Sequence, residues 1–130
     1  MTTIKPVVVK QLPETVSAEE SLIFYRELES VLESDRPRLV FDFTKVRNFD
    51  SSGVELLLRC MEEAMKRNGD LKLAALSPQL TVILEMTRVD RLFEIFDNCT
   101  DAVESFHRFL PLSMQSIAPS MNAAGGKLQS

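Results

Sequence analysis

Hydrophobic and polar positions along the chain repeat with two different periods, which predicts short strands separated by helices. Apolar runs typical of buried strands stand at 7–9, 39–43, 71–76 and 92–96. Helical spacing of apolar residues covers 17–32, 52–67, 77–87 and a last segment from 101 onward. Strands that alternate with helices indicate an α/β domain, here with a small, mostly parallel or mixed sheet packed with helices.

The ends of the predicted helices carry residues that favour starts and stops. Ser17 and Glu20 have the spacing of a capping box, and Asp101 with Glu104 opens the last helix in the same way. Ser77–Pro78 pairs a capping serine with a proline at the first helical position. Asn68–Gly69 is a typical helix stop.

Two of the predicted helices carry an apolar stripe that should face the core. In the first helix the stripe is Leu22, Phe24, Tyr25, Leu28, Val31 and Leu32. In the second it is Val54, Leu57, Leu58, Met61, Ala64 and Met65. Cys60 is predicted to be a small core residue, and Met61, Met65 and Met86 are predicted to fill gaps in the core.

The bulk composition narrows the class of protein. A chain of 130 residues fits one domain, and a formal net charge of -4 argues against a nucleic-acid binder, which is usually basic. No window reaches the roughly 18 apolar residues of a membrane span. Cys60 and Cys99 fit no metal or redox spacing, so we expect a reduced, cytoplasmic protein with neither metal nor cofactor. After Leu110 the periodic pattern stops, which predicts a domain over 1–110 and a flexible tail over 111–130.

The most informative segment joins the strand at 39–43 to the second helix. Asp50, Ser51, Ser52 and Gly53 open that helix, so two hydroxyls stand where backbone N–H groups point outward and the helix dipole favours negative charge. A phosphate is well tolerated at such a place. Asp42, inside the apolar strand, needs partners for its carboxylate, and N–H groups of the following loop are the expected donors.

These residues resemble the STAS domain, which is found in anti-sigma factor antagonists and in the cytoplasmic part of sulfate transporters. The resemblance rests on the strand with Asp42, the loop apolars Val46 and Phe49, and the helix start over 50–53. It continues through the helix stop at 68–69, Ser77–Pro78 and the stretch 84–89, and covers roughly residues 17–108.

The resemblance implies a bacterial, non-enzymatic regulator of transcription that acts by binding a protein. In soluble antagonists the serine directly after the aspartate is phosphorylated by a partner that is both serine kinase and anti-sigma factor, and by position that serine is Ser51. Ser52 is then the adjacent structural hydroxyl. The surface expected to be read by the partner comprises Asn48, Asp50, Ser51, Ser52, Gly53 and Glu55.

Two features leave alternatives open. Only one strand is predicted before the first helix, whereas the family usually begins with two, and the loop at 12–17 lacks the usual acidic pattern. The chain is therefore also compatible with an interaction scaffold, in a larger signalling or transporter-accessory assembly, that does not use phosphorylation. Without the resemblance, Ser51 would be interpreted as a simple helix cap, and the oligomeric state is open. A hydrolase built on Ser51 and His107 is disfavoured, because the elbow motif and a third orienting group are missing.

Overall fold

The computed structural model describes residues 6–107. Along the chain the elements are β1 (Val8–Gln11), β2 (Thr15–Val16), α1 (Ala18–Leu32), β3 (Arg38–Asp42), β4 (Asn48–Phe49), α2 (Ser51–Lys66), β5 (Asp70–Ala74), α3 (Pro78–Met86), the 3₁₀ helix η1 (Val89–Leu92), β6 (Ile95–Phe96) and α4 (Cys99–His107). The predicted end of the domain at 110 and the predicted tail over 111–130 lie outside the described residues.

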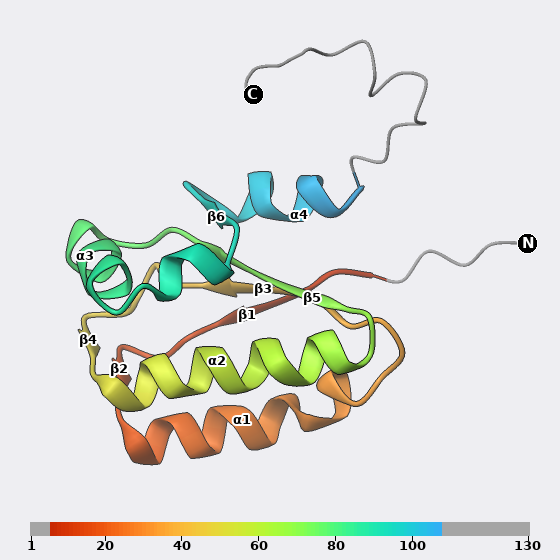
Figure 1. The fold of residues 1–130 in the computed structure, drawn as a ribbon, viewed down its shortest axis with the longest axis horizontal. Coiled ribbons are helices and arrows are strands. Elements are labelled where there is room, and N and C mark those ends of the chain that lie inside the picture. Colours follow the sequence, from red (N-terminus) through yellow and green to blue (C-terminus); the bar gives the residue numbers. More distant parts are fainter. Residues whose placement is uncertain (1–5, 108–130) are drawn as a thin grey trace, which may run out of the picture.

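The main sheet has four strands in the order β1-β3-β5-β6, and every neighbouring pair in it is parallel. A second, two-stranded sheet pairs β2 with β4, also in parallel. The prediction of a single α/β domain with a small, mostly parallel sheet is therefore confirmed. All strands of the main sheet end at one edge, from which the chain continues into α3 and, through β4, into α2 (Figure 1).

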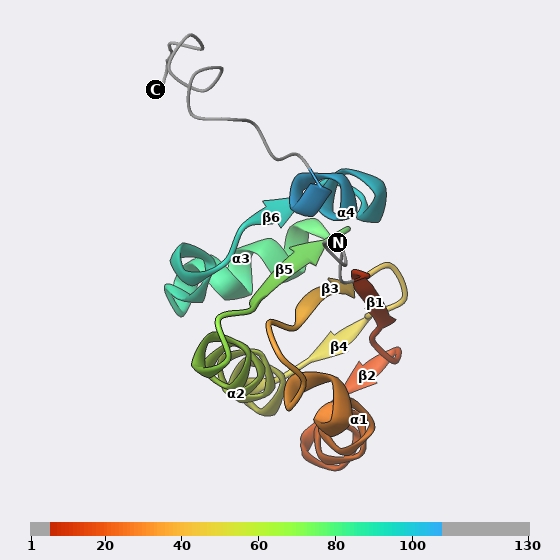
Figure 2. The same cartoon turned by 90° about the vertical axis from the view of Figure 1, so that its right-hand side faces the viewer.

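Helices cover both faces of the sheet, with α1 and α2 on one face and α4 on the other (Figures 1 and 2). Side chains of the central strands alternate between these two layers, as a strand requires. Leu39 and Phe41 of β3 belong to the large core beneath α1 and α2, whereas Val40 between them packs under α4. Burial on both faces explains why the predicted strands read as continuous apolar runs.

The buried face of α2 is rotated from the predicted one. Its buried residues are Gly53, Leu56, Leu57, Cys60 and Ala64. The prediction is correct for Leu57, Ala64 and Cys60, and burial raises the pKa of the Cys60 thiol to about 12. It is wrong for Leu58 and Met65, which are 37% and 58% exposed. Periodicity allowed either face, and contact with the sheet and α1 selected the one that carries Leu56 and Cys60.

Two other residues that were predicted to lie in the core, Leu22 and Met86, are also exposed. On α1, Leu22 is 46% exposed, while Ser21 is buried against α2 and its hydroxyl donates to the carbonyl oxygen of Ser52 at 3.4 Å. Met86 is 78% exposed on α3 and does not fill the core. A small serine at the helix crossing lets the two backbones approach, which an amphipathic pattern alone does not reveal.

The first strand also differs from the prediction. β1 begins one residue later and is an edge strand, so its Val9 is 43% exposed and not buried. The sequence prediction missed β2, which makes the expectation of one strand before α1 wrong. Two residues are too short to leave a period in the sequence.

The caps confirm most predicted boundaries. Ser77 accepts from the Leu80 amide at 3.2 Å, and α2 ends at Lys66, shortly before Asn68, which takes the left-handed conformation at φ 60°. Gly69 is needed for a different reason, because a Cβ there would lie 2.1 Å from the Pro37 carbonyl oxygen.

The N-termini of α1 and α4 differ in detail from the predicted ones. The Ser17 hydroxyl donates to the Glu20 carboxylate and does not cap a backbone amide. α4 begins at Cys99, two residues before the predicted Asp101, because the Asn98 side chain accepts from the Asp101 amide at 2.8 Å.

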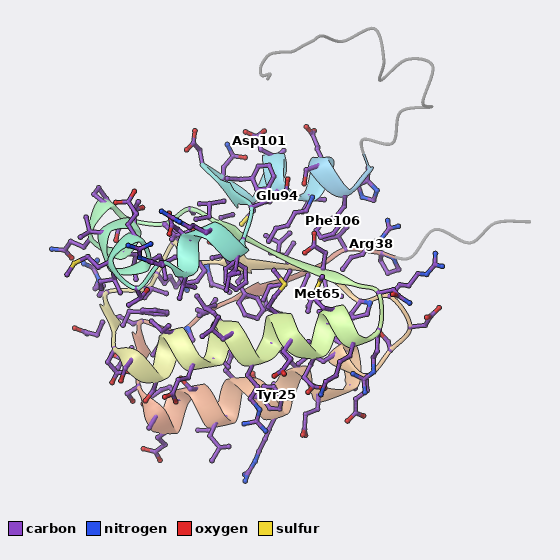
Figure 3. All side chains as sticks on the ribbon, in the orientation of Figure 1. Tyr25, Arg38, Met65, Glu94, Asp101 and Phe106 are labelled. Atoms are coloured by element: carbon purple, nitrogen blue, oxygen red, sulfur yellow. The ribbon has the colours of Figure 1, made fainter. Side chains whose placement is uncertain are left out.

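One polar side chain holds α4 onto the sheet. Lys72, in the middle of β5, is only 6% exposed and lies beneath α4. Its ammonium donates to Ser105 Oγ at 2.6 Å, pairs with Glu94 at 3.1 Å and lies 4.2 Å from the ring centre of Phe106. Figure 3 shows Glu94 and Phe106 on the α4 side of the sheet. These partners offset the cost of burying the charge, so the contact is structural.

The helix face can be tested with two adjacent leucines. Leu57 is fully buried and Leu58 is 37% exposed, although the sequence placed both in one stripe. Leu57→Ala should lower the free energy of unfolding by about 2–5 kcal/mol, since it leaves a cavity in the core. Leu58→Ala should cost less than about 1 kcal/mol. Urea titration monitored by circular dichroism measures both, and equal losses would contradict this orientation of α2.

Candidate functional site

The start of α2 lies at the carboxyl edge of the sheet, beside the start of α1 (Figure 1). The short pairing of β2 with β4 brings the two chain segments that enter these helices together. Asn48 reinforces the pairing, because its amide donates to Thr15 Oγ1 at 3.3 Å. The site is thus assembled from two segments that are more than thirty residues apart in the sequence.

Asp50 is the cap of α2. Its carboxylate accepts from the Ser52 backbone amide at 2.9 Å, and its carbonyl oxygen accepts from the Gly53 amide at 2.9 Å. Ser51 is therefore the first helical residue and not the cap. The alternative in which Ser51 serves only as a cap is wrong, because Asp50 performs that role.

The Ser51 side chain is exposed at the first turn of α2. Within residues 6–107, the structure gives its hydroxyl no hydrogen-bond partner. The group is thus open to an enzyme, and it lies where the helix dipole stabilises added negative charge. Arg47, the arginine nearest to it in sequence, is already paired with Glu14 at 3.1 Å.

Gly53 lies beneath the ring of Phe49 and is buried. A Cβ at this position would come within 2.6 Å of the Phe49 ring. The ring also packs 5.9 Å from that of Phe43 and so joins the core. Of the residues predicted to face a partner, Gly53 is the one that the structure removes from the surface, and its role is to let α2 start close to β4.

The remaining predicted residues surround Ser51. Asn48 and Glu55 are exposed, and Ser52 is half-buried. Ser52 and Glu55 line a groove of about 210 Å³ between α1 and α2. The residues opposite them are Ala18, Ser21, Leu22 and Tyr25, with Leu56 and Arg59 at the α2 side.

The sequence placed Tyr25 in the apolar stripe of α1 and gave Arg59 no role in a site, yet the two form one wall of this groove. The Arg59 guanidinium lies 4.1 Å from the centre of the Tyr25 ring, an arrangement that orients the cation. Tyr25 extends from α1 beside α2 in Figure 3. No local pattern marks this pair, because the two residues come from different helices.

Asp42 anchors the loop that leads to the site. Its carboxylate accepts from the Thr44 amide at 2.9 Å and from the Thr44 hydroxyl, which confirms the expectation of loop donors. Burial alone would raise the pKa of Asp42. The Thr44 hydrogen bonds, with smaller contributions from Cys99 and Gln11, outweigh burial and hold this pKa below its ordinary value.

The described residues bring together neither the pair Ser51 and His107 nor a cluster of metal ligands. The start of α2 and the end of α4, where Ser51 and His107 lie, are at opposite ends of the molecule (Figure 1), so the two cannot act together. Among residues 6–107, no three His, Cys, Asp or Glu side chains gather as metal ligands would. In the same range, none of the helices has the length and apolar character needed to cross a bilayer.

Comparisons with known proteins agree on one family. A model described as the STAS domain matches residues 1–102. No curated protein matches the chain. The fold resembles a protein from Thermotoga maritima with a suggested role as anti-sigma factor antagonist, at a TM-score of 0.71 and 17% identity, covering 82% of this chain and 92% of that one.

Two further solved structures are similar. An anti-sigma-factor antagonist (STAS) domain protein from Planctomyces limnophilus has a TM-score of 0.69 and 21% identity, covering 76% of this chain and 89% of that one. The STAS domain of a SulP transporter from Vibrio cholerae has a TM-score of 0.65 and 12% identity, with 88% of both chains covered. At these identities the likeness concerns the fold.

The contact between Gly53 and Phe49 can be measured by a double-mutant cycle. Gly53→Ala should be destabilising by about 1–3 kcal/mol, because the new methyl group meets the Phe49 ring. In a Phe49→Ala background the same change should be neutral or stabilising, since alanine favours the helix by about 1 kcal/mol over glycine. Chemical denaturation of the four proteins gives the coupling, and a coupling near zero would show that the ring does not lie over Gly53.

Stability should depend on pH through Asp42. Its folded pKa lies below the unfolded one, so its contribution is present above about pH 4 and is lost as pH falls through the folded pKa. Asp42→Asn should therefore cost about 0.5–1.5 kcal/mol at pH 7 and progressively less in acid. Thermal unfolding from pH 7 to pH 3 tests this, with exposed Asp35→Asn as the control. A difference that does not shrink in acid would contradict this role.

Proposed function

Because the chain belongs to the STAS domain family, we propose that it is a phosphorylation-switched binding protein of the anti-sigma factor antagonist type. It binds a serine kinase that also acts as anti-sigma factor when Ser51 is unphosphorylated, and it releases that partner when Ser51 carries phosphate. The observation that carries the proposal is the exposed Ser51 at the first helical position, with the cap already supplied by Asp50. The proposed setting is the bacterial cytoplasm, and the protein has no catalytic role of its own.

The switch is electrostatic and local. A phosphate on Ser51 adds about -1.5 to -2 charges near neutral pH. The α2 dipole lowers its cost to the fold, whereas the neighbouring Asp50 carboxylate opposes it. Arg47 already pairs with Glu14, so the charge of the phosphate would remain unneutralised on the surface that the partner contacts.

The contact surface follows from the exposed groups around Ser51. We propose that Asn48, Asp50, Ser52 and Glu55 surround the phosphoacceptor in the interface, and that Gly53 contributes by setting the position of the helix beneath Phe49. The groove between α1 and α2 extends this surface to Tyr25 and Arg59. An interface of this kind is weakened by a desolvated phosphate that its partner does not neutralise.

A second candidate is an interaction scaffold without a phosphorylation switch. The fold similarity to the STAS domain of a SulP transporter supports this alternative, since that domain is part of a larger protein. The two functions differ in a measurable way: only the switch requires the Ser51 hydroxyl.

The test is phosphorylation in vitro with a candidate serine kinase of the histidine-kinase-like ATPase type and ATP. Mass mapping should find phosphate on Ser51. Ser51→Ala should lose it while retaining the fold, and Ser52→Ala, the matched control, should keep it. Ser51→Asp should weaken kinase binding only in part, because it brings one charge where phosphate brings nearly two.

Three results would contradict the proposal. Phosphate on Ser52, or labelling of Ser51→Ala at the wild-type level, would remove Ser51 as the acceptor. Phosphorylation of Ser51 with unchanged partner affinity, measured by isothermal titration calorimetry, would leave the scaffold as the better function.

A further inference from the structure

The outward face of α2 carries four charges in alternating order. Glu55, Arg59, Glu62 and Lys66 are all exposed, and their spacing of four, three and four residues places them in one stripe along the helix. Read from the start of the helix, their signs are negative, positive, negative and positive.

Pairs within the helix are the ordinary explanation of such a pattern, since glutamate four residues before a cation is favourable. The structure forms neither of the two such pairs in this stripe, Glu55 with Arg59 or Glu62 with Lys66. Lys66 pairs with Glu63 at 3.1 Å, and Arg59 lies over the Tyr25 ring. In the described part of the chain, Glu55 and Glu62 take part in no ion pair.

An apolar strip runs beside the charged stripe. Leu58 and Met65 of α2 are 37% and 58% exposed, and Leu92 of η1 is 56% exposed. Together with Met61 they line a shallow, mainly apolar groove of about 710 Å³, whose charged edge consists of Glu55, Arg59 and Glu62. Grouped apolar side chains with a polar rim mark an interaction surface, whereas single exposed ones do not.

We infer that this face binds a second copy of the same chain, with the two α2 helices packed antiparallel across a two-fold axis. Because the four charges alternate in sign, an antiparallel arrangement places each negative residue of one copy opposite a positive residue of the other. Glu55 then faces Lys66 of the second copy, and Arg59 faces Glu62 of the second copy. In this register Leu58 and Met65 of the second copy lie on the same side of the interface, offset by two residues or about 3 Å along the helix, so the apolar strips also meet.

Charge complementarity favours an antiparallel second copy over a parallel one and over a partner of another charge pattern. A parallel pairing across a two-fold axis would place each charge against itself, which is destabilising. A uniformly charged partner would be attracted by two positions and repelled by the other two. The contact is essentially one helix pair about 24 Å long, so the dimer is weak and depends on concentration.

The experiment measures the mass of the unphosphorylated full chain by sedimentation equilibrium over a concentration series, and it therefore does not depend on the Ser51 switch. The wild type should rise from the monomer mass toward twice that mass. Arg59→Glu and Glu62→Arg should each weaken dimerisation at least tenfold, because like charges then face each other twice.

The two single variants together provide a test of register. Mixing Arg59→Glu with Glu62→Arg restores opposite charges at both contacts, so a heterodimer should form. The double variant R59E/E62R should dimerise with itself for the same reason. Met65→Lys should also weaken the dimer, whereas Met86→Lys, at an exposed position on α3, and Arg26→Glu, on α1, serve as controls and should not.

A wild type that stays monomeric up to about millimolar concentration, where even weak specific association is detectable, would overturn the inference. So would a dimer that Arg59→Glu and Glu62→Arg leave intact, since another surface would then form it. If the single variants lose the dimer but neither the mixture nor the double variant recovers it, the antiparallel register is wrong. Circular dichroism of each variant separates lost association from lost fold.

Discussion

Burial of β3 and β5 on both faces is the constraint on which the rest of the structure depends. Leu39 and Phe41 need a cover on one face and Val40 needs one on the other, so the sheet requires α1 and α2 below and α4 above. Parallel pairing then collects the carboxyl ends of the strands at one edge. The loop from β3 leads through β4 to α2 at that edge, which places Ser51 on an exposed helix start.

The entry into α2 is fixed by contacts of two different kinds. Phe49 packs over Gly53 and sets how near the helix lies to the core, while Asp50 caps the first turn and thereby leaves the Ser51 hydroxyl open. The geometry that suits the proposed phosphoacceptor thus comes from Phe49, Asp50 and Gly53 and not from Ser51 itself. Asp42 supports the same region by fixing the loop through Thr44.

α2 has one face for the core, and we propose that two overlapping parts of its exposed side bind other molecules. Its first turn carries the proposed switch, and its middle carries the alternating charges and the apolar strip proposed to bind a second copy. Glu55 belongs to both surfaces, so dimerisation and partner binding would compete for it. Such competition makes the free concentration of the chain a second variable that acts on the switch.

Local chemistry explains what the sequence determined by itself. Apolar runs, the Ser77 cap, the Asn68 stop and the order Asp50-Ser51-Ser52-Gly53 depend on nearest neighbours, so the α/β fold and the helix start that carries the proposed site were predictable. Tertiary packing decided the rest. It turned α2 so that Leu56 is buried and Met65 exposed, since both faces satisfied the helical period. It also buried Gly53, formed the two-residue β2, and brought Tyr25 to Arg59, because each of these needs a segment distant in the chain.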